Sequence, residues 1–515
     1  MKKIWIYLAL SGSFLLALNS CQKLTEDPKA TLTPKNYFKT QSDLDAAVAA
    51  IYVQLTPDFA WGFTSQMTSY FGSDDLTTDP GLNKGDMRAF DQLNGASSNA
   101  SLLNEWKGPW NAIYQANNVL DNYQKVNSTD SLKQLSAGQA YFLRALSYYY
   151  LVRTFGEVPV ITGAIDVSTR PQRDPVEKVY GLIVSDLQQA ISWLPYTFKD
   201  NPGKATQNAA RSLLSDVYLT MAGWPLNQPQ YYAKAASEAD TVIRSKQYSL
   251  VAKYADVFTN NNTVESIFAL QFNVSGGVPQ RRYGASSVPL DEVASDGSGG
   301  WDDYYPEINF YKNRPICERS DATFYDTLKL KQSNGSFKKV AWDSPLTHAR
   351  HPYYKKFRAG LNGDGVKETA DAILSINPST NKALDLIRYP MVLLNYAEAS
   401  AMACSAPTSD GYTAINQVRQ RAGEKPLTPG LGQTAFRDSV VRERAYEFAG
   451  EIGIRWFDIV RLQLLPQVLA ERSDKENPIN TGVLGNASLL KTRYLAPIPI
   501  SDMNNDPAWD QNSGY

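Results

Sequence analysis

Apolar residues recur every three to four positions through most of the chain, the spacing that lines one face of an α-helix. Residues 42–55 show this spacing clearly, and Ser42 is suited to cap the start of that helix. The same spacing predicts further helices over 109–123, 137–156 and 175–195. Pro109 would lie in a first turn, where proline is tolerated, and Gly156 would end the next helix. The pattern indicates a mainly α-helical protein.

Two later stretches repeat one plan, a helix, a short turn and a second helix within about 35 residues. The pairs are predicted over 208–223 with 231–245, and over 389–403 with 411–423. This period and texture are typical of tetratricopeptide-like helical pairs, and generic helical hairpins are the alternative. Such pairs bury their apolar faces only by stacking on neighbours. We therefore predict a mainly α fold on a solenoid-like helical scaffold over about 40–250 and 385–465.

The texture changes over about 250–385, where glycine, asparagine, serine and proline become frequent. Short β-like pieces appear there, such as SIFALQFNV, and so do two glycine clusters, DGSGGWDDYYPE and LNGDGVKE. A long, loop-rich segment on a helical scaffold is where binding function usually lies. The sequence thus predicts a loop-rich, partly β insert, with an extended C-terminal tail over about 490–515.

The N-terminus has the pattern of a lipoprotein signal peptide. Lys2 and Lys3 precede an apolar run of about 15 residues, which is shorter than the ~20 needed to span a bilayer as a helix. The run ends in LALNSC, which resembles a lipobox with cleavage after Ser20. We expect residues 1–20 to be removed and Cys21 to be acylated, so that lipid chains hold the mature chain, 21–515, on a membrane. An ordinary secretory signal with a chance cysteine is the alternative.

Composition narrows the function classes. The 515 residues carry 51 basic and 52 acidic side chains, so no excess charge recruits nucleic acid, and no second apolar run is long enough to span a membrane. The chain has 30 Tyr, 19 Phe and 10 Trp. These numbers suffice for a core and also for surface platforms, because Tyr and Trp combine an apolar face with a polar tip.

Cysteine and histidine chemistry is sparse. A Cys317–Cys404 disulfide is compatible with an oxidising compartment, but we favour two free thiols. The two histidines, His348 and His351, have helical spacing, yet Pro352 and the lack of a nearby third ligand argue against zinc. Any Ser-His or Cys-His mechanism would have to use these two residues, and no nucleophile-elbow pattern is present.

A helix near residues 441–458 combines charged and apolar residues. Charges inside a buried helix must pair, so we predict a buried ion network that is part of the scaffold rather than catalytic. Its predicted members are Arg442, Glu443, Arg444, Glu447, Glu451, Arg455 and Asp458.

Several of these segments, in this order, resemble the SusD/RagB family of outer-membrane lipoproteins. The likeness runs nearly end to end and is carried by residues 33–55, 106–120, 140–162, 179–195, 218–227, 387–403, 414–423, 441–462 and 494–515. Ile452 and Ile454 depart from the more polar run frequent in the family, and Glu26 and Asp27 follow Cys21 later than its acidic pair does.

The resemblance implies a function. Such proteins bind glycan chains at the outer surface and deliver them to a SusC-like TonB-dependent transporter, on which they sit as a lid. It implies an outer-membrane, lipid-anchored protein facing the cell exterior that needs no cofactor and cleaves no bond.

The resemblance also places the ligand surface on two regions, the stretch after the first helix and the insert. Flat sugar faces stack on aromatic rings, and hydroxyls need polar side chains at the edges. The candidates are Trp61, Tyr70, Asp74, Asp75, Arg88, Asn94 and Asn99 in the first region, and Trp301, Asp302, Tyr304 and Tyr305 in the second, with Trp342 and Arg281 as weaker ones. Exposure is favoured for Trp301, which has Gly and Asp neighbours, although any aromatic here could equally belong to the core.

Other interpretations stay open. The two glycine clusters, one with Asp302 and one with Glu368, could hold a structural calcium ion, but tight turns explain them more simply. The same lid could bind peptides, as in the RagB branch. A glycoside hydrolase would need two carboxylates facing each other across a cleft, and no motif supports it. A helical-repeat scaffold that binds only proteins is a further class.

Overall fold

The computed structural model describes residues 37–78, 82–163, 170–198, 201–273, 283–294, 297–358, 380–476, 483 and 486–515. The predicted signal peptide, the lipidation site Cys21, Arg281 and the NGDG loop with Glu368 lie outside the described residues. Among the helices described, none combines the length and apolar character needed to cross a membrane.

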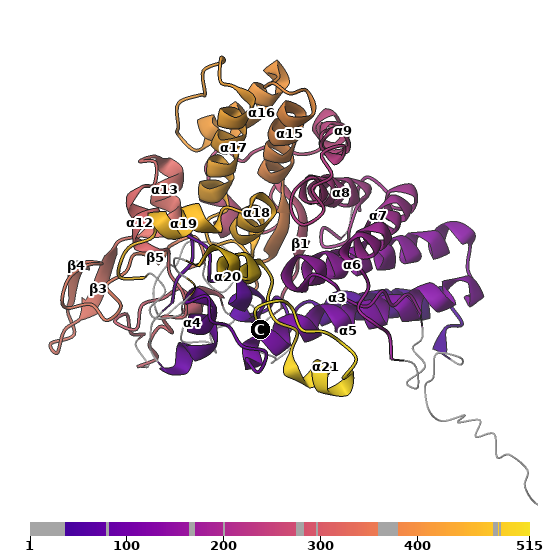
Figure 1. Cartoon of the computed structure of the whole chain (residues 1–515), viewed down its shortest axis with the longest axis horizontal. Coiled ribbons are helices and arrows are strands. Elements are labelled where there is room, and N and C mark those ends of the chain that lie inside the picture. Colours follow the sequence, from indigo (N-terminus) through magenta and orange to yellow (C-terminus); the bar gives the residue numbers. More distant parts are fainter. Residues whose placement is uncertain are drawn as a thin grey trace, which may run out of the picture.

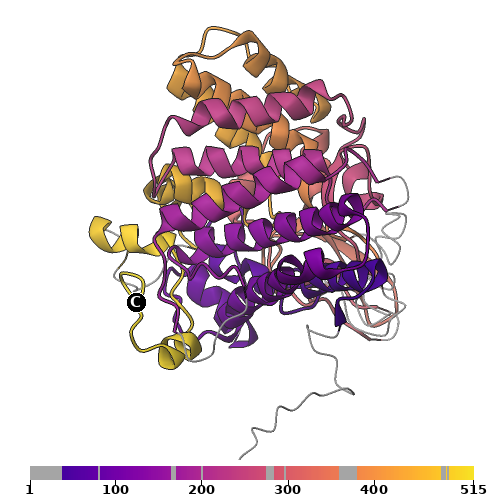
Figure 2. The ribbon, with the colours of Figure 1, turned by 90° about the vertical axis from the view of Figure 1, so that its right-hand side faces the viewer.

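Long helices stack one on the next through most of the molecule (Figure 1). The first series consists of α3 (Gln41–Gln54), α5 (Ala100–Asn122), α6 (Asp130–Phe155), α7 (Val176–Trp193), α8 (Gln207–Ala222) and α9 (Tyr231–Arg244). Helix α9 then packs on α15 (Tyr389–Ala403), which contacts α16 (Ser409–Arg421) and α17 (Gln433–Glu447). Figure 2 shows these helices as successive layers. The predicted mainly α fold with few, short strands is confirmed.

Helix ends follow local chemistry, with two corrections. Thr40, not Ser42, caps α3, because its hydroxyl accepts from the backbone N–H of Asp43 while the Asp43 carboxylate accepts from the Thr40 N–H. Pro109 lies inside α5 rather than in its first turn, since Asn99 caps the helix much earlier. Gly156 follows α6 with φ +73°, a conformation that side chains other than glycine rarely adopt, as predicted.

The insert and the stretch after α3 contain only short elements. The helical ones are η2 (Thr64–Tyr70), η3 (Leu82–Lys84), α4 (Gly85–Asp91), α10 (Asp256–Thr259), α11 (Tyr283–Ser286), α12 (Ile308–Lys312) and α13 (Glu318–Thr323). A further short element, η4 (Tyr123–Lys125), lies between α5 and α6. The strands are β1 (Ser266–Leu270), β2 (Phe324–Tyr325), β3 (Thr327–Lys331), β4 (Phe337–Ala341), β5 (Tyr353–Tyr354) and β6 (Leu384–Arg388). They form three antiparallel pairs, β1–β6, β2–β5 and β3–β4. The first pair joins the two ends of the insert and returns the chain to α15.

The C-terminal part crosses back over the first helices. Its elements are α18 (Ile454–Leu462), α19 (Leu465–Glu471), α20 (Ala487–Lys491), η6 (Thr492–Tyr494) and α21 (Ile500–Asn505). Asn512 donates to the carbonyl of Phe155 at 2.9 Å, and the Trp509 indole donates to the carbonyl of Pro171 at 3.0 Å. These bonds tie the end of the chain to the end of α6 and to the segment that precedes α7.

A buried ion network joins α17, α18 and the segment before α15, as predicted. Arg444 donates to Asp458 at 2.8 Å, and Arg388 reaches both Glu447 at 3.0 Å and Glu451 at 2.7 Å. All five side chains are buried. Two members differ from the prediction: Arg442 is exposed, because it lies on the outer face of α17, and Arg455 pairs with Asp74 from the stretch after α3. Pairing inside the protein assigns these charges to the scaffold.

Candidate functional site

The two regions that were predicted to carry the ligand surface lie side by side. Thr77 and Tyr305 exchange two backbone hydrogen bonds, of 2.9 and 3.1 Å. The Thr78 hydroxyl donates to the carbonyl of Asp303 at 2.6 Å, and Lys84 forms a buried ion pair with the Asp303 carboxylate. The stretch after α3 is thereby fastened to the insert.

Trp61 and Tyr70 are a correction to the predicted ligand surface. The Trp61 side chain is fully buried, edge-to-face on Tyr150 at 4.9 Å. Tyr70 is buried against Phe457 at 4.9 Å, and burial raises the pKa of its hydroxyl well above 10. Neither ring presents a face to solvent, because the stretch after α3 folds back onto the long helices and fills the core there.

Asp74 and Asp75 are occupied by the scaffold. Asp74 receives two hydrogen bonds of 2.6 Å from the Arg455 guanidinium, a bidentate ion pair. Asp75 accepts from the Ser73 hydroxyl at 2.6 Å and from the backbone N–H of Gly450 at 2.7 Å. Burial, with the neighbouring Asp74 charge, raises the pKa of Asp75 to about 6. Asp74 thus fastens the stretch after α3 to α18, and Asp75 fastens it to the turn between α17 and α18.

The polar residues around α4 have mixed roles. Arg88 donates to Asp91 within the helix at 2.6 Å, and Arg472 binds the other oxygen of Asp91, also at 2.6 Å. Asn99 is buried as the cap of α5. Asn94 is exposed, so of these predicted residues it is the one whose side chain faces solvent most openly.

Burial also removes three insert residues from the surface, again contrary to the prediction. Asp302 lies 3.2 Å from Nδ1 of His348, and Tyr305 stacks on the ring of His351 at 4.3 Å. Tyr304 packs near Tyr354 in the core. The physical reason is that the segment is enclosed from two sides. Tyr304 and Tyr305 pack on the two tyrosines of β5, and the bridge to Thr77 covers the other side.

Trp301 keeps part of its ring accessible, unlike its neighbours Asp302, Tyr304 and Tyr305. It is half-buried, rests on the small apolar cluster of Ala285, Val288 and Ala294, and meets Phe63 at 5.7 Å with an interplanar angle of 81°. The backbone at Gly300 packs closely against the backbone at Val288, which brings Trp301 onto this cluster. A Cβ at Gly300 would lie 2.2 Å from the carbonyl oxygen of Val288. The predicted exposure of Trp301 is met only in part, because the side chain is half-buried.

Trp342 is also half-buried, but it packs edge-to-face on Tyr311, at 5.9 Å between ring centres, and among the described residues it makes no ring contact with Trp301 or Phe63.

We call Phe63, Trp301 and His348 the Trp301 surface. The side chain of His348 is 49% exposed, and its Nδ1 lies 3.2 Å from the carboxylate of Asp302, the residue that follows Trp301. Sequence reasoning did not propose Phe63 or His348 as ligand residues. Phe63 stands two positions after Trp61, and nothing in the local sequence says which of these rings turns outward. The histidine had been considered only for metal binding and catalysis.

Metal and thiol chemistry is limited in the part of the chain that the structure describes. It contains no cluster of three or more metal-ligating side chains. His351 is paired with Glu476, so the two histidines have separate carboxylate partners. Cys317 and Cys404 are both free thiols, one buried and one exposed, so the compatible disulfide is not formed.

The family models match at both ends of the chain. A model described as "Starch-binding associating with outer membrane" matches residues 32–219, and one described as "SusD family" matches residues 347–515. Together they cover more than half of the chain.

Known proteins resemble the chain over nearly its whole length. SusD-like protein P2 from Formosa agariphila is 28% identical, over 97% of this chain and 98% of the relative. The starch-binding protein SusD from Bacteroides thetaiotaomicron is 27% identical, over 78% of this chain and 76% of its own.

Solved structures share the fold. A SusD homolog from Bacteroides thetaiotaomicron superposes with a TM-score of 0.79 at 23% identity, covering 94% of this chain and 98% of that one. Surface glycan-binding protein A from the same organism, in complex with laminarihexaose, has a TM-score of 0.72 at 20% identity and covers 93% of this chain and 100% of that one. From the ordered motifs, the helical-pair fold and these matches, the chain belongs to the SusD/RagB family.

Proposed function

We propose that this protein is a non-catalytic cell-surface binding protein that captures glycan chains on the Trp301 surface. The observation that carries the proposal is the half-exposed Trp301–Phe63 pair on the insert of a chain whose relatives include named starch- and glycan-binding proteins. Perpendicular rings form a bent apolar wall on which the C–H faces of sugar rings can pack. The half-exposed imidazole of His348, whose Nδ1 lies 3.2 Å from the Asp302 carboxylate, can offer its other ring nitrogen as a polar contact.

The proposed membrane anchor and transport partner are those of the SusD/RagB family. We propose that lipid on Cys21 anchors the protein to the outer membrane, facing outward, and that it delivers glycans to a SusC-like TonB-dependent transporter as its lid. A Cys21→Ala variant should then leave the membrane fraction. Detergent-solubilised wild-type protein should co-purify with a large β-barrel protein. If the variant stays as firmly membrane-bound as the wild type, the anchor is not Cys21.

The binding test uses affinity electrophoresis with amylopectin, laminarin, xylan, pectin and alginate. Trp301→Ala should weaken retention by the bound glycan about tenfold or more, because truncating a central aromatic anchor typically costs about 2 kcal/mol or more. The control is Tyr114→Ala, which removes a ring that is 61% exposed on α5, outside the Trp301 surface. Equal retention of wild type and Trp301→Ala would refute the assignment of the surface.

The same incubation separates the other functions. Retention without new reducing ends supports a receptor, and released reducing ends would mean a glycoside hydrolase. Binding to peptides but to none of the five polysaccharides would favour the RagB-like lid. The strongly buried carboxyls give the hydrolase no support: burial raises the pKa of Glu105 to about 8, but Glu105 is held by Ser69 inside the protein, with bonds of 2.8 and 3.2 Å.

A further inference from the structure

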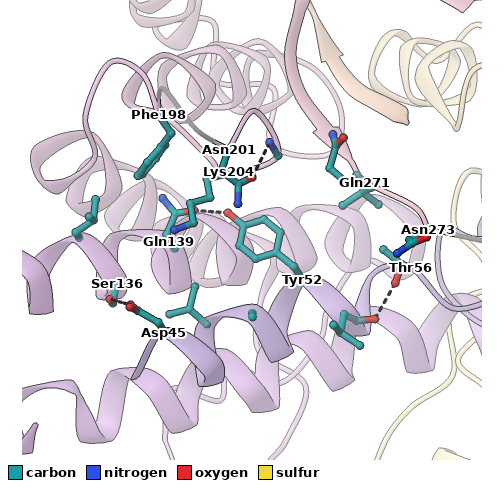
Figure 3. Close-up of a pocket in the computed structure, with 16 residues that line it drawn as sticks. Asp45, Tyr52, Thr56, Ser136, Gln139, Phe198, Asn201, Lys204, Gln271 and Asn273 are labelled. Carbon is teal, nitrogen blue, oxygen red and sulfur yellow. Dashed lines mark hydrogen bonds between the residues drawn. The ribbon is translucent and has the colours of Figure 1, made fainter. Parts of the chain in front are cut away.

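A cavity lies on the helical scaffold, formed by elements other than those of the Trp301 surface. It has a volume of about 410 Å³ and is bounded by α3, α6, the segment before α8 and the end of β1 (Figure 3). This volume falls within the ~300–1,000 Å³ that is usual for small-molecule sites. Four separate parts of the chain therefore meet around a space large enough for a ligand.

The inner wall of the cavity is a fixed polar network. Gln139 on α6 is buried, and its amide donates to the carbonyl of Ala205 at 2.7 Å and accepts from the Ala205 N–H at 3.1 Å. The Tyr52 hydroxyl from α3 donates to the same Gln139 oxygen and accepts from the Ala205 N–H at 2.9 Å. These bonds hold the segment before α8 across α3 and α6, so the cavity exists without a ligand to shape it.

The rim offers further hydrogen-bonding groups. Asp45 on α3 accepts from the Ser136 hydroxyl at 3.2 Å, and the exposed amide of Asn201 stands on the opposite edge. The Lys204 ammonium forms no ion pair within the described residues and lies 5.4 Å from the centre of the Phe198 ring. Figure 3 shows Tyr52, Gln139 and Lys204 close together, with Phe198 on the wall above them.

Part of the lining is apolar. Val48 on α3 and Leu135 on α6 form part of the wall, with the half-buried Phe198 ring. Val53 also lines the cavity and is 58% exposed, so it adds apolar surface near the opening. The cavity thus combines an aromatic ring and aliphatic surface with amide, hydroxyl, carboxylate and ammonium groups.

We propose that this cavity is a second carbohydrate-binding site, which takes one or two units of a neutral sugar. A pyranose ring has apolar C–H faces and a rim of hydroxyls, and it matches a wall of Phe198 and Val48 edged by Lys204, Asn201 and Asp45. The choice of a sugar as the ligand class rests on the proposed function. The site itself does not depend on the Trp301 surface, because the two share no residue.

The test measures binding of maltose, cellobiose, laminaribiose and xylobiose to the mature protein by saturation-transfer NMR titration. Phe198→Ala should weaken the disaccharide that binds at least tenfold, and Lys204→Met should weaken it by a smaller factor. The control is Tyr196→Ala, two positions away, which removes a ring that is 51% exposed and does not line the cavity. Circular dichroism and the melting temperature establish that each variant is folded.

Trp301→Ala in the same titration separates this site from the proposed function. Loss of disaccharide binding in Phe198→Ala but not in Trp301→Ala supports the second site. This conclusion does not depend on whether either variant still retains polysaccharide in affinity electrophoresis. If no disaccharide binds, or if Phe198→Ala binds like the wild type, the second site is refuted. The Trp301 surface would still stand in that case, provided that Trp301→Ala abolishes polysaccharide retention.

Discussion

Replacing Glu447 by glutamine removes one negative charge from the centre of the buried ion network while keeping the size of the side chain. Glu447 ends α17 and has no exposed surface. Its carboxylate lies 3.0 Å from the Arg388 guanidinium and 3.1 Å from that of Arg319, and Arg421 forms a third ion pair with it. The substitution therefore leaves three buried cations short of one shared partner.

The size of the effect follows from the charge balance around Glu447. Burial alone would raise its pKa, but the surrounding guanidinium groups outweigh burial and lower the pKa from 4.5 to about 2. At about 1.4 kcal/mol per pKa unit, this difference corresponds to about 3 kcal/mol of stability near neutral pH. Removing one partner of a buried ion pair typically costs about 3–5 kcal/mol, because the remaining charge is left uncompensated. We expect Glu447→Gln to lower the free energy of unfolding by about 3 kcal/mol or more.

The assay is urea unfolding at pH 7, followed by circular dichroism. Asp438→Asn is the control, because Asp438 also forms an ion pair, with Arg437 at 2.7 Å, but its side chain is 59% exposed. Exposed pairs contribute about 0–1 kcal/mol, so this control should change little. If Glu447→Gln costs no more than Asp438→Asn, the network does not hold the scaffold together.

Two further perturbations probe other parts of the fold. Burial raises the pKa of Glu105 to about 8. The folded state therefore keeps a proton on Glu105 that the unfolded state loses above about pH 4.5. The free energy of unfolding should fall as the pH rises from about 4.5 to 8, by about 5 kcal/mol at most. In Glu105→Gln the fall measured by urea unfolding at pH 5 and pH 8 should shrink, and an unchanged slope would contradict the assignment. Gly300→Ala should lower the free energy of unfolding by about 1–3 kcal/mol and disturb the packing of Trp301 on its apolar cluster. The reason is that the added Cβ would lie 2.2 Å from the Val288 carbonyl oxygen. Gly181→Ala, where a Cβ meets nothing within 4 Å on α7, should instead be neutral or slightly stabilising, and equal effects of the two changes would refute the clash.

Helices were the part of this protein most accessible from sequence. The 3.6-residue spacing of apolar residues and the glycine at position 156 are local signals, and α6 follows them. The start of α5 was missed because its capping asparagine, Asn99, stands well before the proline that had looked like the first turn. The buried ion network was foreseen for the same local reason, since charges on a buried helix must find partners.

The candidate site depended much more on tertiary structure. Trp61, Phe63 and Trp301 all stand in loop-like sequence, yet the first is in the core and the other two form a half-exposed pair. Whether each ring is buried depends on the residues that pack against it. Trp61 is covered by Tyr150, which lies on a helix far along the chain.

The sequence by itself thus determined the helical scaffold and the family, because these depend on spacing and order along the chain. It also predicted two regions for a ligand surface. Only the tertiary structure decided which rings face solvent and where four distant segments enclose the cavity beside Tyr52 and Phe198. The physical reason is that burial is a property of neighbours in space, and those neighbours come from parts of the chain that no local pattern connects.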